Sequence, residues 1–158
     1  MQLKPSEILY SQDSINIYFD SRSSNANHKL GETLDDICEG KCSIESIPAI
    51  TVVNQDGKWM TTDNRRLWVF KELELLGKCV NIQVNVGQSI PEAKRTTKNN
   101  WVSIIIRGYP GGDWYQKHEN RDHYQIVPNS TRYDDNDSDD NFTHSDNSDN
   151  YDSDSDGW

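Results

Sequence analysis

The segment IPAITVVNQDGKWMTTDNRRLWVFKELELLGKCVNIQVNV, residues 47–86, contains the patterns that decide the fold. Two short apolar runs, 50–53 and 59–61, flank the dipeptide Asp56-Gly57. This dipeptide favours a two-residue turn because both of its residues tolerate a positive φ. The segment therefore predicts a β-hairpin.

A helix is predicted directly after the hairpin. Thr62 or Asp63 can cap its first turn, and Gly77 stands where glycine ends helices. Its apolar residues form a regular stripe made of Leu67, Phe70, Leu73 and Leu76. The pattern predicts an amphipathic helix with one buried face. Alternating apolar residues over 80–87 then predict a half-buried strand.

Other segments supply further elements. Residues 3–19 begin with an extended piece, 32–48 form a short helix with a stop at Gly40, and 101–108 form a strand. The glycine-rich stretch over 108–125 is better explained as a turn than as a phosphate-binding loop, because it lacks the Gly-Lys-Ser/Thr ending.

We therefore expect an α+β fold with a mixed sheet and flanking helices. The expected core spans residues 1–88. Residues 89–127, with the strand 101–108 and the glycine-rich turn, extend the same domain.

Two adjacent arginines, Arg65 and Arg66, stand in the first turn of the predicted helix. The amino end of a helix carries unpaired N–H groups and a partial positive charge, so cations are unfavourable there unless an anion binds. Guanidinium groups and helix amides together suit a phosphate. The alternative is that the arginines are solvated, or pair with Asp63 and Glu72 at the surface.

The order of these elements resembles the ParB/sulfiredoxin superfamily. The resemblance is carried by residues 47–86, with residues 1–46 in the order expected of the amino-terminal half. ParB proteins have G-E-R-R at the corresponding motif and sulfiredoxins have G-C-H-R. This chain has Asp63-Asn64-Arg65-Arg66. The resemblance implies nucleotide binding, with the shared arginine, Arg66, on the phosphates.

The motif also departs from both families. The reactive cysteine of sulfiredoxins falls on Asn64, and Cys38, Cys42 and Cys79 lie outside the motif, so sulfiredoxin-type reduction is not expected. The family glycine is replaced by Asp63. The chain lacks room for the helix-turn-helix and dimerisation parts of a partition protein, so nucleic acid binding is not supported.

Some relatives with this fold look like small phosphotransferases or nucleases, in which acidic residues supply base or metal chemistry. The resemblance therefore implies nucleotide hydrolysis or phosphotransfer for this chain, with Mg²⁺ bound to a nucleotide as the candidate cofactor. Asp63 is the catalytic candidate, and the alternative is that it only caps the helix. Glu32 and Asp13 are weaker candidates. The predicted ligand-binding residues are Asn64, Arg65, Arg66 and Arg107.

Charge separates the end of the chain from the rest. The 158 residues include 26 acidic and 16 basic ones, and ten aspartates lie beyond Tyr133. The remaining 16 acidic residues balance the 16 basic ones, so the net charge of -10 belongs to the tail. Residues 128–158 are rich in Asp, Ser and Asn and predict a disordered segment. Its candidate partner is a basic protein, and a catalytically inactive interaction module is the alternative function.

Other side chains predict no special chemistry. No signal peptide or membrane-spanning run is seen, so we expect an intracellular protein with reduced thiols. His118 and His123 have acidic neighbours, but their spacing matches no zinc motif, so no metal site is predicted and a polar surface is expected there.

Overall fold

A computed structural model describes residues 1–19, 27–95, 101–118 and 122–127. The predicted acidic tail, 128–158, lies outside these residues. The described chain has mixed strands and two α-helices, which confirms the α+β class. None of its described helices is both long and apolar enough to cross a membrane.

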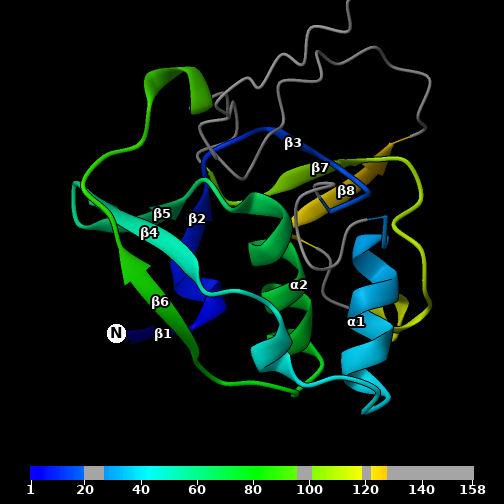
Figure 1. Ribbon diagram of the computed structural model, residues 1–158. Coiled ribbons are helices and arrows are strands. Elements are labelled where there is room, and N and C mark those ends of the chain that lie inside the picture. The colour runs from blue at the N-terminus through cyan, green and yellow to red at the C-terminus, as the bar shows by residue number, and fades with distance from the viewer. Residues whose placement is uncertain (20–26, 96–100, 119–121, 128–158) are drawn as a thin grey trace, which may run out of the picture.

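A mixed five-stranded sheet forms one side of the fold, in the order β1-β6-β4-β5-β2 (Figure 1). Its strands are β1 (Gln2–Leu3), β2 (Ile8–Tyr10), β4 (Ile50–Gln55), β5 (Lys58–Thr61) and β6 (Ile82–Val86). The pairs β1–β6 and β4–β5 are antiparallel, and the pairs β4–β6 and β2–β5 are parallel. A 3₁₀ helix, η1 (Pro5–Glu7), joins the first two strands.

The predicted hairpin is confirmed. Gln55 of β4 pairs with Lys58 of β5, so the turn contains only Asp56 and Gly57. Their φ angles are 52° and 80°, as a two-residue turn between twisted strands requires. Local sequence therefore determines this register.

The helix after the hairpin, α2, spans Asn64–Leu75. Gly77 has a φ of 72°, and Lys78 N–H donates to the Leu73 carbonyl at 2.8 Å, so the predicted glycine end is confirmed. The predicted apolar stripe is buried, with Leu67, Phe70 and Leu73 in the core and Leu76 packed against it. The burial is not one-sided, because polar residues on other faces, such as Lys71 and Glu72, are buried as well.

The first helix, α1, spans Leu30–Cys38 and begins two residues before the predicted range. The Glu32 carboxylate accepts a hydrogen bond from Lys29 N–H at 3.0 Å, which caps the helix there. Gly40 has a φ of 76°, so the chain leaves the helix at the predicted stop. A 3₁₀ helix, η2 (Ile44–Ser46), follows instead of a longer α1.

A second sheet is wholly parallel, with the order β3-β7-β8. Its strands are β3 (Ser14–Asn16), β7 (Ile104–Arg107) and β8 (Tyr124–Val127). The predicted strand 101–108 starts three residues too early, because Trp101 has a φ of 66°. The sequence did not predict β8. The 3₁₀ helices η3 (Glu92–Lys94) and η4 (Trp114–Gln116) lie on either side of β7 in the chain.

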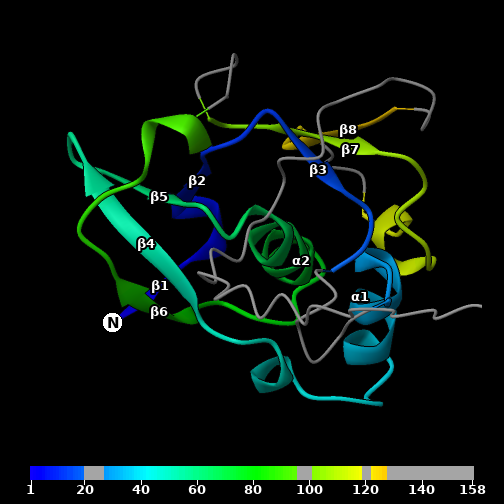
Figure 2. The ribbon, with the colours of Figure 1, turned by 45° about the horizontal axis from the view of Figure 1, so that its top comes forward.

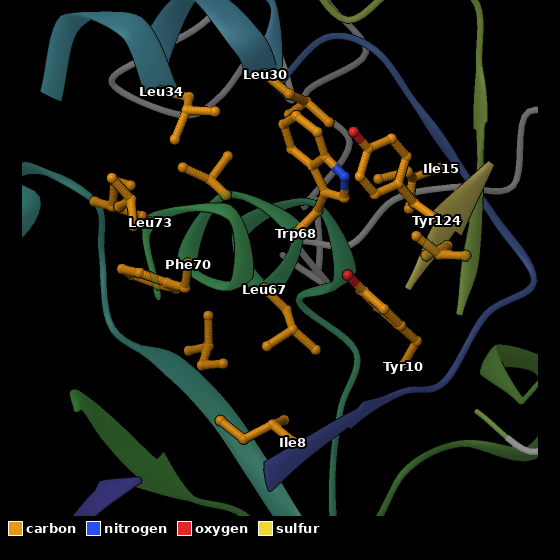
Figure 3. Packing of buried hydrophobic residues seen from close by; sticks show 14 of the residues in the cluster. Ile8, Tyr10, Ile15, Leu30, Leu34, Leu67, Trp68, Phe70, Leu73 and Tyr124 are labelled. Atoms are coloured by element: carbon orange, nitrogen blue, oxygen red, sulfur yellow. The ribbon is translucent and has the colours of Figure 1, made fainter. Parts of the chain in front are cut away.

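Helix α2 occupies the centre of the molecule. Viewed along its axis in Figure 2, it is surrounded by the five-stranded sheet, the β3-β7-β8 sheet and α1. The helix is therefore central, where the sequence predicted a flanking one. The core residues around α2 come from both sheets and from α1 (Figure 3). Trp68 is fully buried, and its ring meets that of Tyr124 edge to face at 5.6 Å between centroids.

Candidate functional site

The predicted site residues Asp63, Asn64, Arg65 and Arg66 meet at the amino end of α2, and their side chains are bonded inside the fold. Nη2 of Arg66 lies 2.6 Å from Oδ1 of Asp63, and Nη1 donates to the carbonyl oxygens of Pro48 and Ala49 at 3.2 and 3.1 Å. The pair is largely shielded from solvent, with side-chain exposures of 15% for Arg66 and 8% for Asp63. The ion pair with Asp63 that we considered does form, but inside the protein.

The carboxylate of Asp63 does not cap the helix. Asp63 occupies the N-cap position, yet its side chain makes no cap hydrogen bond. Its Oδ2 instead accepts a hydrogen bond from Thr51 N–H of β4 at 2.7 Å. Asp63 thus joins the helix start to the sheet.

The side chain of Asn64 is fully buried and joins α2 to the loop after β2. Its Oδ1 accepts from Ser11 N–H at 2.9 Å. Its Nδ2 donates to Ser11 Oγ, Gln12 Oε1 and the Thr62 carbonyl, at 3.0 to 3.2 Å. These contacts fix the start of α2 against the segment that leads into β3.

Arg65 and Arg107 are buried cations, each 7% exposed. Arg65 lies in the first turn of α2, and Arg107 is the last residue of β7, paired in register with Asn16. Directly after Asn16, the Ile17 carbonyl accepts from Leu30 N–H, which begins α1. Arg107 therefore lies close to the start of α1.

Both α-helices begin at the same end of the molecule. They lie side by side and run in the same direction, with their amino ends toward the β3-β7-β8 sheet (Figure 1). The three residues of β3 bridge the two starts, since the chain before β3 contacts Asn64 and the chain after it contacts Leu30. Three residues of strand span about 10 Å.

The glycine-rich loop after β7 is a structural turn, as predicted. Gly108, Gly111 and Gly112 all have positive φ. The loop packs on α1, where Gly31 N–H donates to the Pro110 carbonyl at 2.7 Å. The carboxylate of Asp35 accepts from the N–H groups after the loop, at Asp113 and Trp114. These backbone amides are therefore bound by the side chain of Asp35.

The expected polar surface at His118 and His123 is wrong. Both imidazoles contact Glu72, a fully buried residue of α2. Nε2 of His118 is hydrogen-bonded to Oε2, and Nε2 of His123 lies 2.9 Å from Oε1. Burial and the positive charges of Lys71 and His118 lower the pKa of His123 to about 3. This cluster ties the segment before β8 to the central helix.

Among the described residues, no group of three or more His, Cys, Asp or Glu side chains is arranged to hold a metal ion. Asp63 does not fit Mg²⁺, because each of its carboxylate oxygens already accepts a hydrogen bond.

Cys38 and Cys79 do not resemble reactive thiols. Cys38, Cys42 and Cys79 are free thiols. Burial raises the pKa of both Cys38 and Cys79 to about 11, away from the thiolate form that reacts.

Comparison of the chain with family models, curated proteins and solved structures found no match. The resemblance to the ParB/sulfiredoxin superfamily therefore stays a prediction.

Proposed function

We propose that this domain binds a phosphate-bearing ligand, with a nucleotide as the first candidate, at the end where α1 and α2 both begin. One observation supports the proposal above the others: β3 bridges the starts of the two helices. A buried arginine lies near each start, Arg65 at α2 and Arg107 at α1. Two helix amino ends and two guanidinium groups at one place favour an anion of more than one charge.

The charges at the two helix starts support the proposal. Arg65 stands in the first turn of α2, where the helix dipole is positive, so this end of the helix attracts an anion. Guanidinium groups donate pairs of hydrogen bonds that match phosphate oxygens. A ligand with two or three phosphates has enough oxygens to accept hydrogen bonds from both guanidinium groups.

The proposal changes the role of the other motif residues. Asp63, Asn64 and Arg66 form a frame that holds the helix start, through their bonds to Thr51, Ser11 and the carbonyls before β4. Arg65 replaces Arg66 as the main phosphate ligand. Binding is proposed without a hydrolysis or transfer step, because Asp63 is engaged within the frame.

The test is isothermal titration calorimetry of the full chain with ATP, CTP, GTP and ADP, with and without Mg²⁺. Arg65→Gln and Arg107→Gln each remove a charge-assisted hydrogen-bond donor and should weaken binding by at least about tenfold. Lys58→Gln removes an exposed cation at the hairpin and serves as the control. Circular dichroism checks that each variant is folded.

Two results would overturn the proposal. One is the absence of heat with every nucleotide, which would favour an interaction module instead. The other is undiminished affinity in both arginine variants, which would move the site elsewhere. Arg66→Ala is a poor probe, because loss of the frame would weaken binding indirectly.

A further inference from the structure

Lys71 is a buried amine in the middle of α2, almost two turns from Arg65. The residue is only 7% exposed. In the described part of the chain its Nζ has no carboxylate partner, and it lies 4.6 Å from the centroid of the Tyr10 ring. Buried lysines are normally paired, because a desolvated charge is costly. Burial lowers the pKa of Lys71 to about 8, although the negative charge of Glu74 acts in the opposite direction.

The ring that Lys71 covers carries a second polar group in an unusual position. Tyr10 is fully buried, and its hydroxyl has no hydrogen-bond partner among the described residues. Figure 3 shows this hydroxyl pointing toward α2. Burial, and to a smaller extent the charge of Glu72, raises the pKa of Tyr10. Two neighbouring polar groups without ordinary partners need an explanation other than fold stability.

A pocket of about 290 Å³ opens at Lys71. Leu75 and Val102 give it apolar walls, and His123 lines it beside Lys71. Val102 is 55% exposed, so solvent reaches the pocket edge. The carboxylates in its lining are those of Glu74 and Asp122.

The lining selects a chemical class. Two carboxylates repel a ligand that is itself an anion, and the apolar walls suit a short hydrocarbon chain. A neutral amine reacts with carbonyl compounds, and desolvation is a known way to activate a lysine for that reaction. His123 stays neutral here and adds no competing charge.

We propose that this pocket is a second site of the protein, in which the amine of Lys71 condenses with a small uncharged aldehyde. The neutral nitrogen attacks the carbonyl carbon, a C–N bond forms, and one of the two nitrogen protons moves to the carbonyl oxygen, which becomes a hydroxyl. The hydroxyl and the second nitrogen proton then leave as water, and a C=N bond remains. The step consumes no oxidant or reductant, and it is reversible.

The test uses the full chain with propanal and sodium cyanoborohydride, which reduces the imine to a stable secondary amine. Peptide mass spectrometry then measures the labelling rate of each lysine at pH 7. About a tenth of an amine of pKa 8 is neutral at pH 7, against well under a thousandth of an ordinary lysine. Lys71 should therefore be labelled at least about tenfold faster than the exposed Lys58. The α-amino group is counted separately, because such groups ordinarily titrate near pH 8.

Three comparisons make the result specific. Lys71→Arg should remove the fast-labelled peptide while Lys58 labelling is unchanged. Glyoxylate, an anionic aldehyde, should label Lys71 several-fold more slowly than propanal. Val102→Asp places a charge at the pocket edge and should slow propanal labelling several-fold.

Labelling of Lys71 no faster than that of Lys58 in the unaltered chain would overturn the proposal, and this measurement needs no variant that must fold. Fast labelling that ignores both Val102→Asp and the charge of the aldehyde would also overturn it, because Lys71 would then be a reactive amine without a binding pocket.

Discussion

The pair of Arg66 and Asp63 offers the sharpest test of the frame at the start of α2. We expect Arg66→Met, which keeps the apolar stem and removes the guanidinium, to lower the free energy of unfolding by about 3–5 kcal/mol. The loss has two sources. The hydrogen bonds to the carbonyls of Pro48 and Ala49 disappear, and the carboxylate of Asp63, 8% exposed, loses its ion pair with Arg66.

A double-mutant cycle isolates the pair. Asp63→Asn keeps an oxygen that can accept from Thr51 N–H but removes the charge, so its cost should be smaller, about 2–3 kcal/mol. The double variant should be more stable than the sum of the single losses implies, with a coupling energy of about 1–3 kcal/mol. Against a typical total of about 5–15 kcal/mol, each single change is severe.

The assay is urea unfolding at pH 7 followed by tryptophan fluorescence, since the fully buried Trp68 reports on the core. Lys58→Met, an exposed site, is the control and should change stability by less than about 0.5 kcal/mol. A change of less than about 1 kcal/mol for Arg66→Met would refute the frame. Arg66 would then again be the leading phosphate ligand.

Three further predictions concern other parts of the structure. Gly31→Ala should lower the melting temperature by at least about 8 °C, because its Cβ would lie 1.7 Å from the Gly111 carbonyl oxygen. The control Gly40→Ala places its Cβ in open space and should cost only about 1 kcal/mol, through its positive φ. Equal effects of the two substitutions in thermal unfolding would contradict this packing. Lys71→Met should raise the free energy of unfolding at pH 7 by about 1–3 kcal/mol. The lowered pKa of Lys71, about 8, reflects a desolvation cost that the contact with the Tyr10 ring offsets only in part. A variant that unfolds at lower urea concentration than the unaltered chain would contradict this prediction. The pKa of His123 falls from 6.5 in the unfolded chain to about 3 in the fold, so the stability that this histidine contributes is complete above pH 6.5 and is lost as the pH falls toward 3. About 2 kcal/mol of this stability should be lost by pH 5. His123→Gln should remove that part of the pH dependence, and identical pH profiles of stability for the variant and the unaltered chain would disprove the assignment.

Elements set by neighbouring residues were predictable from the sequence. Asp56-Gly57 fixes the hairpin because two consecutive positive φ angles are needed there, and Gly77 ends α2 for the same steric reason. In each case the signal and the structure lie within a few residues of one another. The position of Arg65 and Arg66 at the helix start was predictable for the same reason, because it depends on residues next to them in the sequence.

Features set by distant residues were not predictable. The four contacts of Asn64 go mainly to Ser11 and Gln12, more than 50 positions away, so nothing beside it in the sequence marks it as buried. Glu72 read as a surface residue because its partners, His118 and His123, lie about 50 positions further along the chain. Strand β8 was missed for a related reason, since it pairs in parallel with β7 and has no hairpin turn to announce it.

The central position of α2 explains why its polar residues carry the functional argument. A helix surrounded by core would be most stable with apolar residues throughout, so each buried polar side chain needs a reason. Asn64 has one in its bonds to the loop before β3, and Glu72 has one in its two histidines. Lys71 has no such partner in the described chain, and replacing it with methionine would remove a cost without breaking a bond. Because the fold would be more stable without Lys71, the presence of this residue calls for a chemical role. For this reason the amine of Lys71, and not the larger Glu72 cluster, supports the second site.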